Sequence, residues 1–495
     1  MRGVAPGASM ILDGPLRQHA RSRPGHPALV HGDRIVDYRE LDALVDGQVD
    51  RLSALGVSRG VAVGVALSDR IDHVVAMFAL ARLGAIHEPL DWRWAPGEQE
   101  QVARRFGARI VLVEPGAPAL GVPTAVVDDA WSAPAAPGRG TRRGEGDEDG
   151  PLVVSLSSGT TGEPKGPLLT HSQLVARFRV FWINLGLSSR DRFLSCTPLY
   201  YGGGRAFALM MLYSGGTVVL CPPPERPEAL CRAAGVYEAT ATFLVPTQLR
   251  RLLALDDATL APIRALRVVV SSGSALHPAE RRAGLARLNK NLIQYYSSTE
   301  GGGVSYLESC EPDGRDASVG RAVFGVDVQC VDDADRPVPA GDVGRVRYRG
   351  PGVAEGFFQQ DSASAFRDGW FYPGDLGSLD PDGYLSLRGR SKDVIIRGGV
   401  NIYPADVEST LLGHPGVADC AVVGWPSSER DEEIAAFVIA KPGESLDEAE
   451  LLQLCVSALA AYKQPKRIFL VAELPRNSLG KVVKADLVAT LPILP

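Results

Sequence analysis

Alternating apolar and polar segments divide the first 310 residues into short buried strands and amphipathic helices. Apolar residues recur at helical spacing over 38–55 and 74–83, whereas 61–67 and 110–113 are short continuous apolar runs. Such short runs are typical of strands that are covered on both faces. Strands that alternate with helices in this way predict a mostly parallel α/β sheet.

The same alternation continues after a segment of different composition. Residues 132–150 are rich in Pro, Gly and charge and lack apolar periodicity, which predicts a linker or an exposed loop. Further strands are expected at the short apolar runs 151–154, 217–220, 242–245, 268–271 and 292–296.

The pattern changes after residue 319. Short alternating runs separated by Gly, Pro and Asp predict a small β-barrel or meander over about 319–387. From about residue 392 the pattern predicts a separate α+β module. Its expected elements are a helix over 404–412, strands near 420–423 and 434–439, and a helix over 449–460.

Composition narrows the class of protein. The chain has 495 residues, which is too long for one core, and its 45% hydrophobic and 22% charged residues are ordinary for a soluble globular protein. A net charge of −6 argues against nucleic acid as a partner. The seven cysteines include no C-x-x-C pair, which argues against a zinc site or a disulfide framework. No signal peptide or long apolar stretch is present, so no membrane contact and a cytoplasmic location are expected.

A loop rich in Gly and hydroxyl residues follows the predicted strand at 151–154. Glycines let backbone N–H groups approach a phosphate, hydroxyls add donors, and a lysine adds positive charge. The spacing does not fit the G-x-x-x-x-G-K-[ST] pattern, so the loop is of another kind. A polar surface loop is the alternative interpretation, but the Pro-Lys-Gly ending favours phosphate binding. Within ten residues the loop contains Ser157, Ser158, Gly159, Thr160, Thr161, Gly162, Lys165 and Gly166.

Three further segments have side chains suited to chemistry. The run from Tyr296 to Glu300 follows a predicted strand, where ligands bind in open α/β sheets, and its aromatic ring and carboxylate suit a base and a Mg²⁺ ion. Asp375 lies in a Gly turn and could accept hydrogen bonds from ribose hydroxyls, with Arg390 alongside. Lys481 lies in a tight turn near the end of the chain, where a solvated charge is the ordinary interpretation.

In their order and spacing, these segments resemble the adenylate-forming superfamily, which includes acyl- and aryl-CoA synthetases, adenylation domains of peptide synthetases, and luciferases. The resemblance covers nearly the whole chain, and the joint occurrence of the motifs is more specific than any one of them. It implies an α/β fold with a large N-terminal domain of packed α/β sheets and a small β-barrel subdomain, residues 1–391. A hinge would join this domain to a small α+β C-terminal domain, residues 392–495.

The resemblance also implies roles for the matching residues. The loop from Ser157 to Lys165 would embrace the β- and γ-phosphates. Thr299 would contact the α-phosphate, Glu300 would hold Mg²⁺, and Lys481 resembles the lysine that orients the carboxylate and the α-phosphate. The remaining implied contacts are adenine stacking on Tyr296 with Ser297 beside it, the adenine and acyl pocket wall at Gly273, Ser274 and Ala275, ribose binding by Asp375 and Arg390, the hinge at Lys392, and the thiol channel at Gly398 and Gly399.

The implied reaction joins a carboxylic acid to a thiol in two steps. The carboxylate attacks the α-phosphorus of ATP and expels pyrophosphate, and Mg²⁺ and a cation neutralise the approach of two anions. A thiol then attacks the acyl-adenylate. Rotation at the hinge would withdraw Lys481 and bring in the Gly398-Gly399 loop. The cofactors implied are ATP, Mg²⁺ and CoA, or the pantetheine of a carrier protein.

Several positions depart from the pattern common in the family: Ser297 stands for a usual Gly, Tyr201 for a frequent His, Pro373 for a Thr, and Pro167 for a small aliphatic residue. Tyr201, Arg205 and Ser297 are expected at the acid pocket. An inward-pointing Arg205 could pair with a second anionic group of the substrate, and an arginine that faces solvent or pyrophosphate is the alternative. Aromatic residues near this pocket favour an aryl or short acid over a long-chain fatty acid.

The leading hypothesis is therefore an AMP-forming acid–thiol ligase that acts on a small carboxylic acid, most simply an aryl- or short acyl-CoA ligase. Within the class, the alternatives are an enzyme that loads an acyl carrier protein and one with a non-thiol acceptor, such as a nitrite-activating diazotase. A non-catalytic nucleotide-binding regulator is the alternative from another class, and the retained charged residues argue against it. The sequence leaves open the acid, the acceptor, the pathway and the oligomeric state.

Overall fold

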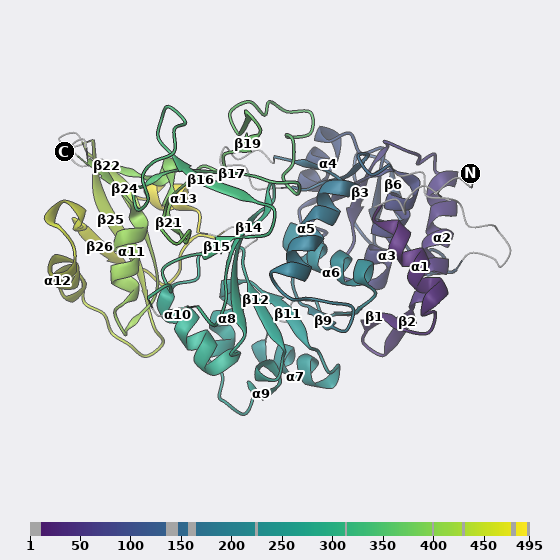
Figure 1. Cartoon of the computed structure of the whole chain (residues 1–495), viewed down its shortest axis with the longest axis horizontal. Coiled ribbons are helices and arrows are strands. Elements are labelled where there is room, and N and C mark those ends of the chain that lie inside the picture. Colours follow the sequence, from purple (N-terminus) through teal and green to yellow (C-terminus); the bar gives the residue numbers. More distant parts are fainter. Residues whose placement is uncertain are drawn as a thin grey trace.

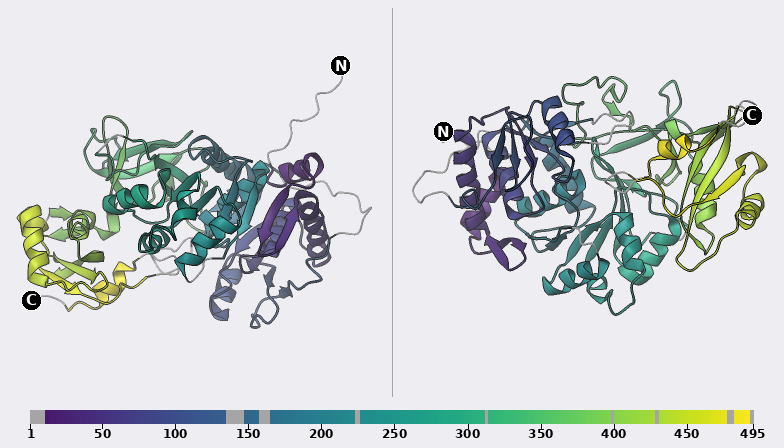
Figure 2. Two further views of the ribbon diagram at one scale, coloured as in Figure 1. Left: turned by 90° about the horizontal axis from the view of Figure 1, so that it is seen from below. Right: turned by 180° about the vertical axis from the view of Figure 1, so that it is seen from behind.

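The computed structural model describes residues 11–134, 147–156, 165–222, 226–311, 314–397, 400–427, 431–476 and 482–492. A large N-terminal domain is followed by a smaller C-terminal domain, as predicted. Helices α1 (Asp13–Ser22) and α12 (Glu448–Ala458) lie at opposite ends of the molecule (Figures 1 and 2). The boundary between residues 391 and 392 stays a prediction.

The first sheet of the N-terminal domain has the strand order β6-β5-β3-β4-β7-β8. Its neighbours pair in parallel except for β7 and β8, which pair antiparallel. Side chains of β3 alternate between two cores, because Val63 and Val65 face the helices shared with the second sheet while Ala62 and Ala66 face the opposite side. The strands are β3 (Ala62–Ala66), β4 (Ile86–Pro89), β5 (Ile110–Val113), β6 (Thr124–Val126), β7 (Pro151–Val154) and β8 (Leu168–Thr170).

The second sheet has the order β15-β14-β13-β12-β11-β9-β10-β1-β2. The strands from β13 to β1 are parallel, and antiparallel partners pair at both edges. The mostly parallel α/β architecture predicted for this region is therefore present. The strands are β1 (Pro27–His31), β2 (Arg34–Asp37), β9 (Arg192–Ser195), β10 (Thr217–Leu220), β11 (Ala241–Leu244), β12 (Val268–Ser271), β13 (Leu292–Ser298), β14 (Gly302–Leu307) and β15 (Arg321–Ala322).

Helices fill the space between the two sheets and cover their outer faces (Figure 1). Helices α2, α3, α5 and α6 share one apolar core with strands of both sheets, whereas α7 to α9 cover the far face of the second sheet and α4 that of the first. The helices are α2 (Tyr38–Ala54), α3 (Ile71–Leu83), α4 (Pro96–Arg105), α5 (His171–Ile183), α6 (Gly202–Ser214), α7 (Pro227–Val236), α8 (Pro246–Leu253), α9 (Ala261–Arg264) and α10 (Pro278–Ala283), which continues as a π-helix (Gly284–Leu288).

An antiparallel sheet follows, in the region where the sequence predicts the β-rich subdomain. Its order is β18-β19-β17-β20-β21, with β16 paired to β17. Gly, Pro and Asp turns separate strands whose apolar faces pack around Tyr348, Phe371 and Leu385. The strands are β16 (Asp327–Val331), β17 (Gly344–Arg349), β18 (Phe366–Arg367), β19 (Trp370–Phe371), β20 (Asp375–Leu379) and β21 (Leu385–Arg390).

The C-terminal domain is built on a sheet of order β23-β22-β25-β24, with β26 paired to β25. Its two faces bury separate cores, one shared with α11 and α12 and the other with α13. The elements are 3₁₀ turns at Ser391–Asp393 and Ala461–Lys463, β22 (Ile395–Arg397), β23 (Val400–Ile402), α11 (Pro404–Leu412), β24 (Val417–Ser427), β25 (Asp431–Ala440), β26 (Arg467–Leu470) and α13 (Lys484–Ala489). Across the described ranges, no helix is both long and apolar enough to cross a membrane.

Candidate active site

The stem of the predicted phosphate loop is the antiparallel pair β7 and β8. Residues 157–164, which include Ser157, Ser158, Gly159, Thr160, Thr161 and Gly162, lie outside the described residues. Lys165 is described, and its ammonium lies 5.1 Å from the centre of the Phe357 ring. Gly166 is sterically required, because a Cβ there would approach side chains of Val154 and Phe106 to 2.5 and 2.7 Å. Gly166, at the described end of this segment, therefore packs closely against the core.

Tyr296, Asp375 and Arg390 converge although they come from two different sheets. The Tyr296 hydroxyl donates to Oδ2 of Asp375 at 2.5 Å, and Nε of Arg390 lies 3.2 Å from Oδ1. Asp375 and Arg390 are cross-strand partners in β20 and β21. Burial raises the pKa of Tyr296, and the Asp375 carboxylate raises it further. The Tyr296 phenol is therefore neutral, and the Asp375 carboxylate contacts both this phenol and the Arg390 guanidinium.

The turn after β13 contains Thr299 and Glu300, and several groups fix it from outside. Ser298 Oγ lies 2.6 Å from the Tyr348 hydroxyl and accepts a bond from the Gly301 N–H at 2.8 Å. Burial raises the pKa of Tyr348, and the nearby carboxylates of Glu300 and Asp375 raise it further. Tyr348 therefore contacts the Thr299–Glu300 turn through Ser298 and is near the Asp375 carboxylate, which links the two parts of the site.

Arg177 of α5 also holds this turn, and none of the motifs pointed to it. Its guanidinium donates to the carbonyl oxygens of Thr299 and Glu300. The available signal was local, because Arg177 lies between Leu174 and Phe181 in a largely apolar and mostly buried helix, where a charge is unexpected.

The predicted adenine and acyl pocket wall begins at the end of β12. Gly273 has φ +102°, a conformation that L side chains rarely adopt, and a Cβ there would lie 3.3 Å from the Tyr201 hydroxyl. Ser274 and Ala275 follow it and are exposed. Before it, Ser272 Oγ lies 3.0 Å from Ser297 Oγ. The structure thus brings Tyr201, Gly273 and Ser297 to one place, and it adds Ser272, which directly precedes Gly273 and for which the resemblance implies no role.

Aromatic rings fill the space under Tyr201. A Cβ on Gly203 would lie 3.0 Å from ring atoms of both Tyr201 and Phe243. Behind them, Phe207 stacks on Phe243 with ring centroids 4.8 Å apart, and on Phe181 at 4.3 Å. The floor of this region is therefore closed by packed rings.

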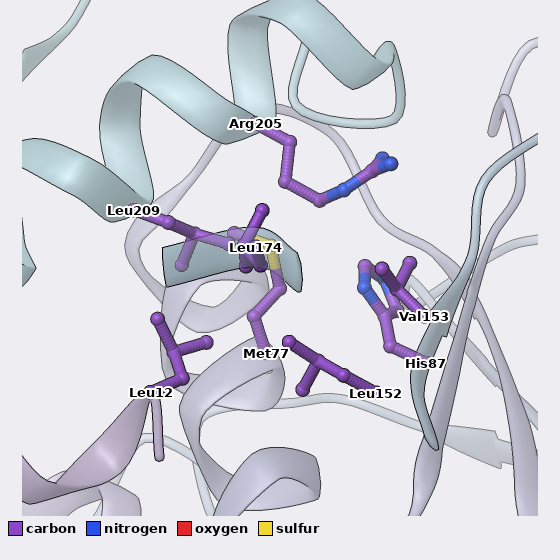
Figure 3. Close-up of a pocket in the computed structure, with 8 residues that line it drawn as sticks. All are labelled: Leu12, Met77, His87, Leu152, Val153, Leu174, Arg205 and Leu209. Carbon is purple, nitrogen blue, oxygen red and sulfur yellow. The ribbon is translucent and has the colours of Figure 1, made fainter. Parts of the chain in front are cut away.

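Arg205 is buried in α6 and makes contacts with the protein itself. Nη2 donates to Ser155 Oγ at 2.5 Å, and Nη1 donates to the carbonyls of Tyr200 and Leu199 at 2.9 and 3.3 Å. Figure 3 shows its side chain beside His87, at a cavity with room for about one water molecule. Burial lowers the pKa of Arg205 to about 9, so it stays charged at neutral pH. Because Arg205 is buried, it does not face solvent.

Of the site residues predicted in the C-terminal domain, only Lys392 lies within the described residues. Lys392 follows Arg390 in a 3₁₀ turn and its side chain is half exposed. Strands β22 and β23 pair on either side of Gly398 and Gly399, which lie outside the described residues, as does Lys481. Arg388 and Asp406 form an ion pair of 3.5 Å between the two predicted domains.

Two family models match the chain. A model described as AMP-binding enzyme matches residues 16–358, and one described as AMP-binding enzyme C-terminal domain matches residues 406–481.

Similar proteins cover nearly the whole chain. An indoleacetate–CoA ligase of Aromatoleum aromaticum is 34% identical over 95% of this chain and 96% of its own length. A feruloyl-CoA synthase of an Amycolatopsis species is 32% identical over 95% and 97%. The crystal structure of ATP-bound MatB from Rhodopseudomonas palustris superimposes with a TM-score of 0.89 at 26% identity, covering 97% of this chain and 99% of that one.

Proposed function

Since the chain belongs to the AMP-binding enzyme family, we propose that it is an AMP-forming ligase that joins an aryl or short carboxylic acid to coenzyme A. The observation that carries this proposal is the convergence of Tyr296, Asp375 and Arg390 beside the Thr299–Glu300 turn. The site lies at the carboxyl end of β13, where open α/β sheets bind nucleotides. Relatives named as CoA ligases support the reaction class.

In this proposal the nucleoside binds at the Asp375 cluster. The Tyr296 ring would stack on adenine, and Asp375 would accept hydrogen bonds from the ribose hydroxyls while Arg390 holds the carboxylate in place. The phosphates would extend past Thr299 towards Lys165 and the loop that begins at Ser157. These roles are consistent with the geometry of Asp375, whose two carboxylate oxygens face Tyr296 and Arg390.

The residues fit a magnesium ion that the nucleotide helps to hold. Magnesium is usually bound by one or two carboxylates together with substrate phosphates and water. Glu300 would supply that carboxylate, and among the described residues no cluster of three or more His, Cys, Asp or Glu forms an all-protein metal site. When bound, the ion would neutralise charge on the phosphates.

The two steps balance as follows. A carboxylate oxygen of the acid forms a bond to the α-phosphorus of ATP while the bond from that phosphorus to the β-phosphate oxygen breaks and pyrophosphate leaves. The thiol sulfur of CoA then bonds to the acyl carbon, the acyl C–O bond breaks, and AMP leaves with that electron pair as the thiol loses its proton. Lys481 is the predicted cation of the first step.

Packing under Tyr201 supports a compact acid. A Cβ on Gly203 would already lie 3.0 Å from ring atoms of both Tyr201 and Phe243, and Phe207 stacks on Phe243 behind them. A long alkyl chain would have to displace this packed core, whereas a compact acid held beside Tyr201 would not. The hydroxyls of Tyr201 and Ser297 would face polar substituents of the acid, and pairing of Arg205 with a second anionic group stays a prediction.

Acid-dependent pyrophosphate release tests the proposal. The wild-type protein is assayed with ATP, Mg²⁺ and a panel of aryl, short aliphatic and fatty acids, and separately with nitrite plus arylamines. CoA, a pantetheinylated carrier protein and an amine are compared as acceptors. We expect release with aryl or short acids and an acyl-CoA product. Lack of release with every carboxylate would refute the ligase proposal.

Substitution of the predicted catalytic lysine tests the assignment of its role. Lys481→Ala is expected to lower the rate of pyrophosphate release about 10²- to 10³-fold, the usual effect of losing one preorganised charge. Lys290→Ala, at an exposed lysine that precedes β13 and belongs to none of the motifs, is the control. An unchanged rate in Lys481→Ala would refute the role but not the reaction.

A further inference from the structure

Arg177 joins three segments of the site through its guanidinium. Nε donates to the carbonyl of Gly352 at 2.8 Å, Nη1 to that of Thr299 at 3.1 Å, and Nη2 to that of Glu300 at 2.8 Å. All three nitrogens are used, which matches the planar fork of a guanidinium and no other side chain. The residue is buried in the middle of α5.

Burial of this cation is costly, so its place calls for an explanation. A charged group loses strong hydration when it leaves water, and carbonyl dipoles replace only part of it. Burial lowers the pKa of Arg177 to about 10, and the guanidinium remains charged at neutral pH. An apolar residue at this helix position would avoid the cost of a buried charge but would remove a donor from three backbone carbonyls, so the arginine is tied to the conformation of those segments.

Two glycines show independently that the site is built around the Arg177 side chain. Gly302 has φ +69°, and a Cβ on it would lie 2.8 Å from Nε of Arg177. A Cβ on Gly352 would lie 2.9 Å from Cγ of Arg177. Both neighbouring backbones therefore approach the arginine more closely than any other residue type permits.

The bonds fix two consecutive peptide planes. The carbonyls of Thr299 and Glu300 belong to the peptide groups on either side of Glu300, and the Glu300 carbonyl also accepts the Ala354 N–H at 2.9 Å. On the other side, Ser298 is held by Tyr348 and Gly301. With both planes fixed, the directions in which the Thr299 and Glu300 side chains leave the backbone are fixed as well.

We propose that Arg177 is a positioning residue that sets the Thr299–Glu300 turn for the metal-bound triphosphate. This inference rests on the proposed function, since it assigns Arg177 to the same nucleotide site. Arg177 acts through the two backbone carbonyls and does not touch the reacting atoms. Its loss should therefore impair use of magnesium and ATP, while the binding of the acid beside Tyr201 changes little.

Arg177→Lys is the main test. Lysine keeps the positive charge but, as a point charge, cannot hold three divergent carbonyls. We expect kcat to fall about 10- to 100-fold and the Mg²⁺ concentration for half-maximal activity to rise several-fold, with KM for the acid changed less than twofold. Arg179→Lys, at an exposed arginine two residues along the same helix, should leave all three values unchanged.

A second variant disturbs the same contacts from the other side. Gly352→Ala leaves the charge of Arg177 intact but places a methyl group 2.9 Å from its Cγ. It should reproduce the raised Mg²⁺ requirement in milder form, and it decides the question if Arg177→Lys does not fold by circular dichroism. Unchanged magnesium dependence in the folded variants, or an equal rise in KM for acid and ATP, would overturn the proposal. Wild-type protein without any acid-dependent pyrophosphate release would instead refute the proposed function.

Discussion

At the scale of single residues, Asp375 is the group on which the proposed nucleoside site depends. One oxygen accepts from Tyr296 and the other faces Arg390, so the carboxylate orients an aromatic ring and a cation at once. Its geometry is set by pairing in β20 and β21, and that pairing brings Arg390 directly opposite.

Asp375→Asn should weaken the binding of ATP without preventing folding. The amide keeps the shape of the side chain but loses the charge, and hydrogen bonds to a charged group contribute about 1.5–3 kcal/mol. KM for ATP should therefore rise about 10- to 100-fold in steady-state pyrophosphate release. Asp327→Asn, which removes an exposed partner of Arg349, is the matched control. An unchanged KM for ATP in Asp375→Asn would mean that this carboxylate does not hold the ribose.

Gly203→Val tests the acid pocket. The added side chain would push against the rings of Tyr201 and Phe243, because a Cβ alone already lies 3.0 Å from both. KM for the preferred acid should rise at least about 10-fold, the order expected for steric loss of a well-filled apolar contact, with KM for ATP unchanged.

Gly97→Val is the control for this variant. Gly97 and Gly203 are each the second residue of a helix, but a Cβ on Gly97 would meet nothing within 4 Å. Equal effects of the two substitutions on the acid would place the pocket elsewhere.

The residues of the candidate site differ in how readily the sequence reveals them. Tyr296, Asp375 and Arg390 stand in recognisable motifs, and the structure brings them together. Arg177 and Tyr348 stand in none, because Arg177 reaches the Thr299–Glu300 turn from a helix and Tyr348 reaches Ser298 from another sheet. Such contacts depend on tertiary packing, which local pattern does not encode.

At the scale of elements, the strands β7 and β8 flank the predicted phosphate loop, and α5 follows β8 directly. Thr170 caps α5 by accepting from the Gln173 N–H, and the Gln173 side chain returns to the Thr170 N–H, so the helix starts at once after β8. The first helical residue, His171, accepts a hydrogen bond at Nδ1 from the Leu12 N–H at 3.1 Å.

His171 makes stability depend on pH. Burial lowers its pKa to about 4, below its value in the unfolded chain, and protonation at Nδ1 would break the bond to Leu12. The unfolded chain therefore binds more protons between about pH 6.5 and 4, so this contribution is complete above about pH 6.5 and is lost as the pH falls. The linkage amounts to about 2 kcal/mol at pH 5.

Denaturant unfolding at about pH 7.5 and pH 5 checks this sign. The free energy of unfolding of the wild type should fall between the two pH values by about 2 kcal/mol more than that of His171→Gln, which has no group to protonate there. A fall of equal size in both proteins would assign the pH dependence to other buried groups.

Elements that show a clear apolar run or a clear helical spacing of apolar residues are found where the sequence predicts them. The strands predicted at 110–113 and 151–154 and the helix at 404–412 coincide with β5, β7 and α11. Strand β4 carries no such signal, because His87 and Glu88 occupy its centre and both are buried. Burial raises the pKa of Glu88 to about 9, so its side chain is neutral at this position. A sequence rule that places Glu at the surface cannot predict such a buried neutral carboxyl.

At the scale of the whole molecule, the small domain meets the large one through α11 and β21. The ion pair of Arg388 with Asp406 spans them, while Lys463 holds the other oxygen of Asp406 at 2.6 Å. Half-exposed pairs of this kind contribute at most about 1 kcal/mol, so this contact permits rotation at the predicted hinge, Lys392. The fold class and the order of the two domains can be predicted from the sequence. The relative placement of the domains cannot, because it depends on such weak contacts.

Transfer of an oxygen isotope tests the proposed chemistry most directly. An acid that supports pyrophosphate release is labelled with ¹⁸O in its carboxylate and incubated with ATP, Mg²⁺ and CoA, and the AMP is examined by mass spectrometry. Attack of the carboxylate on the α-phosphorus, followed by cleavage of the acyl C–O bond by the thiol, places one ¹⁸O atom in AMP. Unlabelled AMP, or label found in inorganic phosphate together with ADP, would contradict the acyl-adenylate route.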